Sequence, residues 1–156
     1  MTDDDLVLLK ELLTRQRVLA LGVLVDGRPC VGLLPFAVGP DFSTALVHAS
    51  GLARHSKGMN EGAPFSALIH SPDRPEADPL QLPRLTLEGT MSVLERGSGG
   101  YEEGRELYTT RFPTSVQTFA LGDFNLYALH LEKGLLVGGF ARARRISVDT
   151  LRQLAS

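Results

Sequence analysis

Two strand-forming segments on either side of an Asp-Gly dipeptide limit the folds that this chain can adopt. Residues 17–25 and 29–38 are rich in Val and Leu, and Asp26-Gly27 lies between them. A type I′ turn needs positive φ at both central residues, which Asp-Gly tolerates, so this pattern predicts a β-hairpin. A second turn at Gly39-Pro40-Asp41 and a strand over residues 44–49 extend the hairpin into an antiparallel meander.

The rest of the chain predicts more strands and only short helices. Apolar runs bounded by turn residues place the other strands at 65–71, 84–96, 125–131 and 135–140, the last two joined as a hairpin through Glu132-Lys133-Gly134. Capping residues and helical spacing place helices at 4–16, 57–62, 101–111, 114–121 (capped by Thr114) and from Ser147 or Asp149 to about 155. Six or seven strands with few helices favour a mainly β (α+β) antiparallel barrel over repeated βαβ units.

The connecting segments carry their own signals. Residues 72–83 contain four prolines and three acids, so we expect a loop outside the barrel. Residues 97–100 are expected to form a flexible link. Gly89 lies inside a strand pattern, which indicates a bulge or a point of close approach.

Size and charge exclude several classes of protein. A chain of 156 residues suits one domain, with an N-terminal helix at 1–16, a barrel at 17–146 and a C-terminal helix at 147–156. Net charge is −2, which argues against a nucleic-acid partner. The acidic N-terminus is unlike a signal peptide and no apolar run reaches the length of a membrane span, so we expect a cytoplasmic protein without a membrane partner.

The four histidines and the single cysteine predict no structural metal and no disulfide. His48, His55, His70 and His130 lack metal-ligand spacing, and Cys30 is alone. His48 and His70 alternate with apolar residues, so we expect satisfied strand histidines there. His55 has neighbours that favour a functional role.

Those neighbours form the cationic segment, residues 54–57, which is the strongest candidate for a binding site. Arg54, His55, Ser56 and Lys57 follow a strand and precede an expected short helix. A guanidinium, a hydroxyl, an ammonium group and the first helical N–H groups suit a phosphate. The alternative is a solvated loop with two surface cations. His55 and Ser56 do not form a nucleophile–base pair, because adjacent loop side chains rarely face each other.

Four parts of the sequence, in this order, resemble the pyridoxamine 5′-phosphate oxidase-like, FMN-binding split-barrel superfamily, and within it the haem-utilisation branch. These parts are Gly27-Arg28-Pro29 with Leu33-Leu34-Pro35-Phe36, then Ser50-Gly51-Leu52-Ala53-Arg54-His55-Ser56, then Arg84-Leu85-Thr86-Leu87-Glu88-Gly89, and finally Gly122-Asp123-Phe124-Asn125-Leu126-Tyr127 with Val137-Gly138-Gly139-Phe140-Ala141-Arg142-Ala143. The resemblance implies a six-stranded antiparallel split β-barrel that dimerises and holds FMN at the subunit interface.

The resemblance also implies which residues bind the cofactor. The expected flavin-ring neighbours are Gly32, Leu33, Leu34, Pro35 and Arg84. The expected phosphate neighbours are His48, Ala49, Ser50, Arg54, His55, Ser56 and Lys57. Arg142 is either a flavin or substrate contact or, with Arg144 and Arg145, part of an edge strand protected by charge.

The sequence departs from the family pattern at Gly32, Gly58 and residues 62–64, where relatives usually carry polar or charged side chains. Each lost charge-assisted hydrogen bond costs about 1.5–3 kcal/mol, which predicts weak or absent FMN. The tail after Phe140 holds arginines but no histidine, which argues against pyridoxamine phosphate as the substrate. Haem-degrading relatives supply haem ligands from a C-terminal extension, and this sequence ends at Ser156, which weakens the haem alternative.

The leading expectation is an FMN-dependent oxidoreductase acting on a small molecule. The flavin carries the redox chemistry, so no catalytic residue need stand out. The alternatives are a haem-binding or haem-degrading protein of the same fold and a non-catalytic dimeric binding module. We expect a homodimer, because Val31, Leu33, Leu34 and Phe36 make one strand apolar on both faces.

Overall fold

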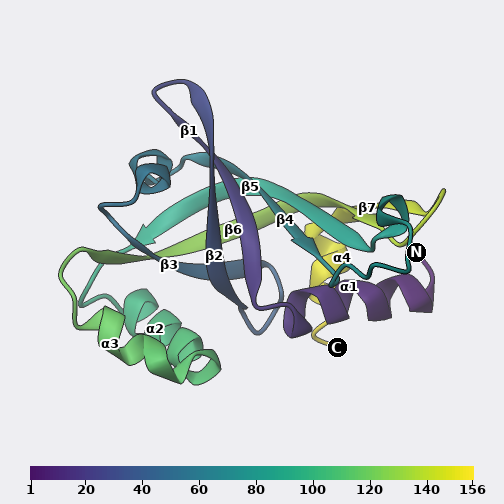
Figure 1. Cartoon of the computed structure of the whole chain (residues 1–156). Coiled ribbons are helices and arrows are strands. Elements are labelled where there is room, and N and C mark those ends of the chain that lie inside the picture. The colour runs from purple at the N-terminus through teal and green to yellow at the C-terminus, as the bar shows by residue number, and fades with distance from the viewer.

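One antiparallel sheet closes on itself in the computed structural model of this protein, which describes residues 1–156 (Figure 1). The strands are β1 (Val18–Val25), β2 (Arg28–Val38), β3 (Thr44–Ser50), β4 (Pro64–His70), β5 (Arg84–Leu94), β6 (Phe124–Val137) and β7 (Ala143–Ser147). Their order is β3-β2-β1-β4-β5-β6-β7, and β3 also pairs with β6. The first six strands therefore form a closed barrel, and β7 extends it as an edge strand. The expected six-stranded antiparallel split β-barrel is confirmed.

The Asp26-Gly27 turn forms as the sequence predicts. Both residues have positive φ, 52° and 74°, and Val25 pairs with Arg28 across the turn. The alternating burial of β1 and β4 directs one face of each strand into the barrel core.

The structure corrects the prediction for residues 125–140. They form one continuous strand, β6, and not a hairpin through Glu132-Lys133-Gly134. Opposite this strand Gly89 pairs with Leu131 and Glu88 pairs with Lys133, so Glu132 is the extra residue of a β-bulge. A Cβ on Gly134 would lie 2.6 Å from the carbonyl oxygen of Thr86, so this glycine permits close strand pairing and makes no turn.

Four α-helices and three 3₁₀ helices surround the barrel. The α-helices are α1 (Asp3–Arg15), α2 (Gly99–Arg111), α3 (Val116–Phe119) and α4 (Val148–Gln153), and the 3₁₀ helices are η1 (Arg54–Gly58), η2 (Pro79–Gln81) and η3 (Pro113–Ser115). No helix combines the length and the hydrophobicity needed to cross a membrane.

Several helix boundaries differ from the sequence predictions. The helix expected at 57–62 is wrong, because the 3₁₀ turn begins at Arg54 and contains the cationic segment. The flexible link at 97–100 is wrong in part, because the Ser98 side chain accepts from the backbone N–H of Tyr101 and starts α2 at Gly99. Thr114 lies inside η3 and caps nothing. Ser147 is the residue that caps α4.

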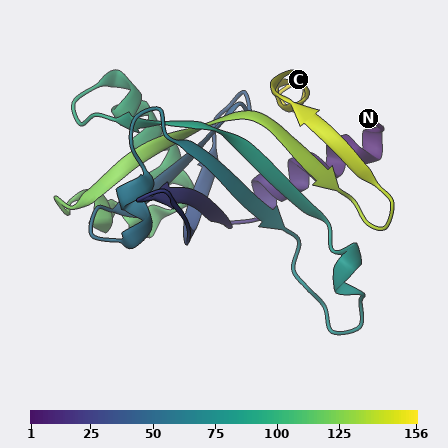
Figure 2. The same cartoon turned by 90° about the horizontal axis from the view of Figure 1, so that it is seen from above.

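The helices gather at two ends of the barrel. Helices α2 and α3 lie together beside β3, and α1 and α4 lie near the other end (Figure 1). A second apolar core, separate from the barrel interior, holds α2 and α3 to β3 and β6 through residues that include Leu46, Tyr101, Tyr108, Phe119 and Leu126. The segment between β4 and β5 projects away from the barrel, as expected for residues 72–83 (Figure 2).

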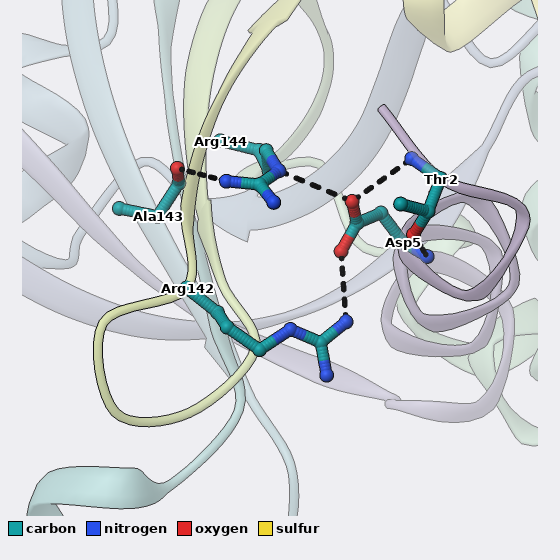
Figure 3. A network of polar contacts seen from close by, with 5 residues as sticks. All are labelled: Thr2, Asp5, Arg142, Ala143 and Arg144. Atoms are coloured by element: carbon teal, nitrogen blue, oxygen red, sulfur yellow. Dashed lines mark hydrogen bonds and ion pairs between the residues drawn. The ribbon is translucent and has the colours of Figure 1, made fainter.

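A buried carboxylate holds α1 to the segment around β7 (Figure 3). Asp5 is only 1% exposed. Its Oδ1 accepts from Nη2 of Arg142 at 3.2 Å, and its Oδ2 accepts from Nε of Arg144 at 3.2 Å and from the backbone N–H of Thr2 at 3.0 Å. The Thr2 hydrogen bonds, followed by those of the arginines, outweigh burial and lower the pKa of Asp5 to about 2. Asp5 therefore stays ionised at neutral pH and joins the two ends of the sequence.

We expect Asp5→Asn to lower the melting temperature at pH 7 by several degrees, because two arginines lose a charged partner. The pKa of Asp5 is lower in the folded than in the unfolded state, so its stabilisation is present at neutral pH and is lost as pH falls from about 4 to about 2. Thermal melts followed by circular dichroism over this range should fall less steeply for the variant. Asp3→Asn, in the same helical turn but exposed, is the control. Equal melting temperatures at pH 7 would contradict the role given to Asp5.

Candidate functional site

A cavity of about 530 Å³ lies where the barrel meets the helical region 108–118. This volume is typical of cofactor and small-molecule sites. Strands β1, β2 and β3, helix η1 and the segment from α2 to α3 all contribute to its wall. We call it the histidine cavity, because His48 and His55 both line it.

The histidine cavity brings together only part of the predicted site. The predicted residues that line it are Leu34, Pro35, His48, Ala49, Ser50 and His55. Leu33 is exposed on the outside of the barrel. Arg84 donates to the carbonyl oxygens of Leu80 and Leu82, and Arg142 bonds Asp5, so neither arginine reaches this cavity within one chain.

The cationic segment has fewer free donors than the sequence suggests. Ser56 is buried, and its hydroxyl donates to the carbonyl oxygen of Ser50 at 2.6 Å. The hydroxyl of Ser50 donates to Oδ2 of Asp123 at 2.8 Å. Because each hydroxyl has one proton, neither can also donate to a phosphate. Arg54 and Lys57 remain exposed and make no ion pair.

Two of the glycines that depart from the family pattern allow η1 to lie against the barrel. A Cβ on Gly58 would lie 2.4 Å from the carbonyl oxygen of Leu24. A Cβ on Gly32 would lie 2.5 Å from Nδ1 of His55. The imidazole of His55 therefore occupies the space that a side chain at position 32 would need.

The four histidines separate into two pairs. His70 and His130 have partners, since Nδ1 of His70 lies 2.7 Å from the carbonyl oxygen of Ser71 and Nε2 of His130 lies 2.7 Å from Oγ of Ser92. His48 and His55 line the histidine cavity, and each has a buried Nε2 with no hydrogen-bond partner. Burial lowers the pKa of His55. The two histidines in the cavity are thus the two with a ring nitrogen that is both buried and unpartnered.

His48 is fixed on all sides. Its ring stacks on Phe119 with centroids 3.8 Å apart and lies edge-on to Tyr108. Burial, and then the charge of Arg96, lower its pKa to about 4, so the ring is neutral at pH 7. The expectation of a satisfied strand histidine is therefore correct for its place in β3, but only one of its two nitrogens has a partner.

Hydrogen bonding also sets the tautomer of His48. Its Nδ1 lies 3.2 Å from Oγ1 of Thr118, and that same oxygen lies 2.8 Å from the carbonyl oxygen of Ser115. The hydroxyl has one proton, which goes to the carbonyl, so Oγ1 accepts from Nδ1–H of His48. Nε2 is left with its lone pair.

Sequence reasoning missed the helical wall of the cavity, which includes Tyr108, Phe112 and Thr118. One signal was available. Tyr101, Tyr108, Phe112 and Phe119 are spaced by seven, four and seven residues, which predicts a single aromatic face on this helical region. The structure contains no group of three or more His, Cys, Asp or Glu side chains that could together hold a metal ion.

Comparison with known proteins decides the family. No protein-family model matches the sequence. Haem oxygenase HutZ of Vibrio cholerae is 31% identical over 146 residues, which cover 92% of this chain and 81% of HutZ. The chain belongs to the haem-utilisation branch of the pyridoxamine 5′-phosphate oxidase-like split-barrel superfamily. The resemblance seen in the sequence is confirmed.

Solved structures show the same fold. The structure of a haem-binding protein of Mycobacterium smegmatis matches this chain with a TM-score of 0.83 and 18% identity, over 98% of this chain and 62% of that protein. A crystal structure of HutZ, described as a haem storage protein, gives a TM-score of 0.73 and 26% identity, over 84% of this chain and 93% of HutZ. A Clostridium acetobutylicum protein of the pyridoxinephosphate oxidase family gives a TM-score of 0.66 at 13% identity, over 97% of this chain and 99% of that protein. This chain therefore spans less than two thirds of the length of the mycobacterial protein.

We expect Gly32→Ser to destabilise the protein, because the new side chain and the imidazole of His55 need the same space. Overpacking of this kind costs about 1–3 kcal/mol of unfolding free energy. Adding His55→Ala should recover part of that loss, so a double-mutant cycle by urea denaturation should show coupling between the two positions. Gly122→Ser is the matched control, since a Cβ there meets nothing within 4 Å. Additive effects at positions 32 and 55 would show that the two residues do not share this space.

Proposed function

We propose that this protein binds haem in the histidine cavity and acts in haem utilisation, with haem degradation as its activity. The observation that carries the proposal is the 31% identity with haem oxygenase HutZ across 92% of the chain. This corrects the order of the sequence-based expectations, in which an FMN-dependent oxidoreductase came first and haem second.

The residues around the histidine cavity suit a haem. Its walls include Leu34, Phe112 and Phe124, which offer apolar contacts to a macrocycle. Two imidazoles carry unpartnered nitrogens, and histidine is a common haem ligand. The exposed Arg17 also lines the cavity, and its guanidinium suits a propionate carboxylate. Haem would supply the iron and dioxygen chemistry, while these residues bind and orient it and exclude water.

FMN is the second candidate, and the cationic segment is the feature that favours it. Arg54 and Lys57 are exposed and able to pair with a phosphate. The hydroxyls of Ser50 and Ser56 are already used within the protein, so a flavin phosphate would gain no hydroxyl donor from either. The FMN proposal therefore rests on two exposed cations, Arg54 and Lys57.

Titration with hemin tests the proposal. We expect a saturable Soret band with a Kd of about 1 µM or tighter, and loss of that band when reductant and dioxygen are added. FMN and riboflavin, titrated in parallel by fluorescence, should bind at least tenfold more weakly. Tight FMN binding that weakens with Arg54→Ala and for riboflavin, together with no saturable Soret band, would replace the haem proposal by the FMN proposal.

We also propose that the protein is a homodimer. The outward side chains of β1, β2 and β4 form an exposed apolar face, made of Val18, Leu24, Val31, Leu33 and Leu68. Val31 is 71% exposed and Leu33 is 68% exposed, and strand pairing places Ala20 between Leu33 and Leu68. The sequence-based expectation of a dimer also relied on Leu34 and Phe36. These two residues of β2 point into the barrel and are buried. A second copy related by a two-fold axis would cover the outer face on both subunits.

Leu33→Glu should convert the dimer to a monomer, because it places a charge in the middle of this apolar face. Light scattering coupled to size exclusion should give twice the chain mass of 16.9 kDa for the parent protein and 16.9 kDa for the variant. Leu52→Glu, at an exposed position between β3 and η1, should leave the dimer intact. A parent mass of 16.9 kDa at micromolar concentration would refute the dimer.

A further inference from the structure

We propose that Arg17 recognises a free carboxylate on the ligand of the histidine cavity, and that Arg111 is the positioning residue that holds Arg17 in place. The inference rests on the proposed function and deepens it, because it makes the carboxylate the group by which the cavity selects its ligand. The ligand class is a largely apolar molecule with an acidic edge, and the propionates are the form in which haem offers that edge.

Arg17 lies on the exposed edge of the histidine cavity, between α1 and β1. Its backbone carbonyl oxygen accepts from the N–H of Phe36 at 3.1 Å, which continues the pairing of β1 with β2. The guanidinium carbon lies 5.4 Å from the ring centroid of Phe112, another residue of the cavity wall. A guanidinium that stacks on a ring keeps its N–H edge available for a carboxylate.

Arg111 holds the segment that carries Arg17. Its Nη2 donates to the carbonyl oxygen of Gln16, the residue just before Arg17. Its guanidinium carbon lies 5.4 Å from the ring centroid of Phe36 and 5.5 Å from that of Phe112. Arg111 is half-buried and does not line the cavity, so it acts through Arg17 and does not touch the ligand.

The two arginines place like charges close together without a carboxylate partner. None of the five ion pairs in the structure includes Arg17 or Arg111. Burial, and then the charge of Arg17, lower the pKa of Arg111, so each cation disfavours the other. By contrast, Arg142 and Arg144 share the carboxylate of Asp5 (Figure 3). A ligand carboxylate would supply to the first pair the negative charge that Asp5 supplies to the second.

Stacking on aromatic rings is the alternative role for these arginines. It accounts for Arg111, which contacts two rings and a carbonyl oxygen. It accounts less well for Arg17, which is exposed, contacts one ring and lies beside a second cation. Nε of Arg111 is also buried without an acceptor, so the pair has surplus donors as well as surplus charge. A purely structural role predicts that Arg17 affects acidic and esterified ligands equally.

Protoporphyrin IX is the probe for the first test, because it carries the propionates and no iron. Its binding therefore does not depend on which residue or segment ligates the iron. We expect a saturable change in porphyrin fluorescence, with the dimethyl ester of the same porphyrin binding about tenfold more weakly. Added sodium chloride should weaken binding of the acid and leave binding of the ester nearly unchanged.

Variants locate the group that distinguishes acid from ester. Arg17→Met keeps an apolar side chain over Phe112, and we expect it to bind the acid about tenfold more weakly and the ester with the parent affinity. Arg111→Met, and Arg111→Lys as a milder change, should reduce the difference between acid and ester severalfold. Arg15→Met is the matched control, because it removes the same charge from an exposed site that pairs with Glu11. Circular dichroism checks that each variant is folded.

A second measurement needs no variant. In the ¹⁵N NMR spectrum of the parent protein, the Nε–H signal of Arg17 should shift when protoporphyrin IX is added and shift much less with the dimethyl ester. A signal that responds equally to the two porphyrins would overturn the inference.

The outcomes separate this inference from the proposed function, provided that hemin is titrated in parallel. Saturable hemin binding with equal affinities for acid and ester, or with an unchanged difference in Arg17→Met, overturns the inference and leaves the haem proposal standing. An unchanged difference in both Arg111 variants overturns the positioning role. Selective binding of the acid without a saturable Soret band from hemin supports the carboxylate site and overturns the haem proposal. Failure of the parent to bind either porphyrin or hemin overturns both.

Discussion

The pairing of β3 with β6 is the interaction on which the rest of the structure depends. It runs from Thr44 opposite His130 to Ser50 opposite Phe124, between segments more than seventy residues apart in sequence. Without it, β3 would be an edge strand that pairs only with β2, and the backbone groups on its other side would be exposed. With it, the barrel is closed, Asp123 reaches the hydroxyl of Ser50, and β3 and β6 present one joint face to α2 and α3. The histidine cavity exists only because this long-range pairing forms.

A single bulge allows one edge of β6 to pair with two strands in succession, β3 and then β7. Before the bulge, residues 124–130 pair with β3, and after it, residues 133–137 pair with β7. The extra residue at Glu132 accompanies this change of partner, and Gly89 makes room opposite it, because a Cβ there would lie 1.8 Å from the carbonyl oxygen of His130. Once β7 is paired, Arg144 in this strand and Arg142 just before it reach Asp5. The barrel and the contact between the chain ends therefore depend on the same irregularity.

Local patterns predicted the local elements, and long-range partners could not be read from them. The Asp26-Gly27 hairpin, the strands around it and the projecting 72–83 segment follow from turn chemistry and spacing within a few residues. Glu132-Lys133-Gly134 was misassigned because a turn and a bulge use the same residue types. From sequence alone Arg142 is a candidate ligand contact, because its bond to Asp5 spans 137 positions and no local pattern shows it. His48 shows the same contrast. Its place in a strand follows from the local pattern, whereas its bond to Thr118 joins residues 70 positions apart and could not be predicted.

The histidine cavity lies between the two apolar cores of the protein, and residues of both cores line it. Within either core an unpartnered ring nitrogen would be an uncompensated loss, since an unsatisfied buried polar group costs about 1–3 kcal/mol. Two such nitrogens, on His48 and His55, border this one cavity, while both histidines elsewhere have partners. A ligand that bonds one of them removes that cost only in the folded state, and binding then stabilises the fold. A ligand that completed the site would therefore account for the two buried, unpartnered nitrogens.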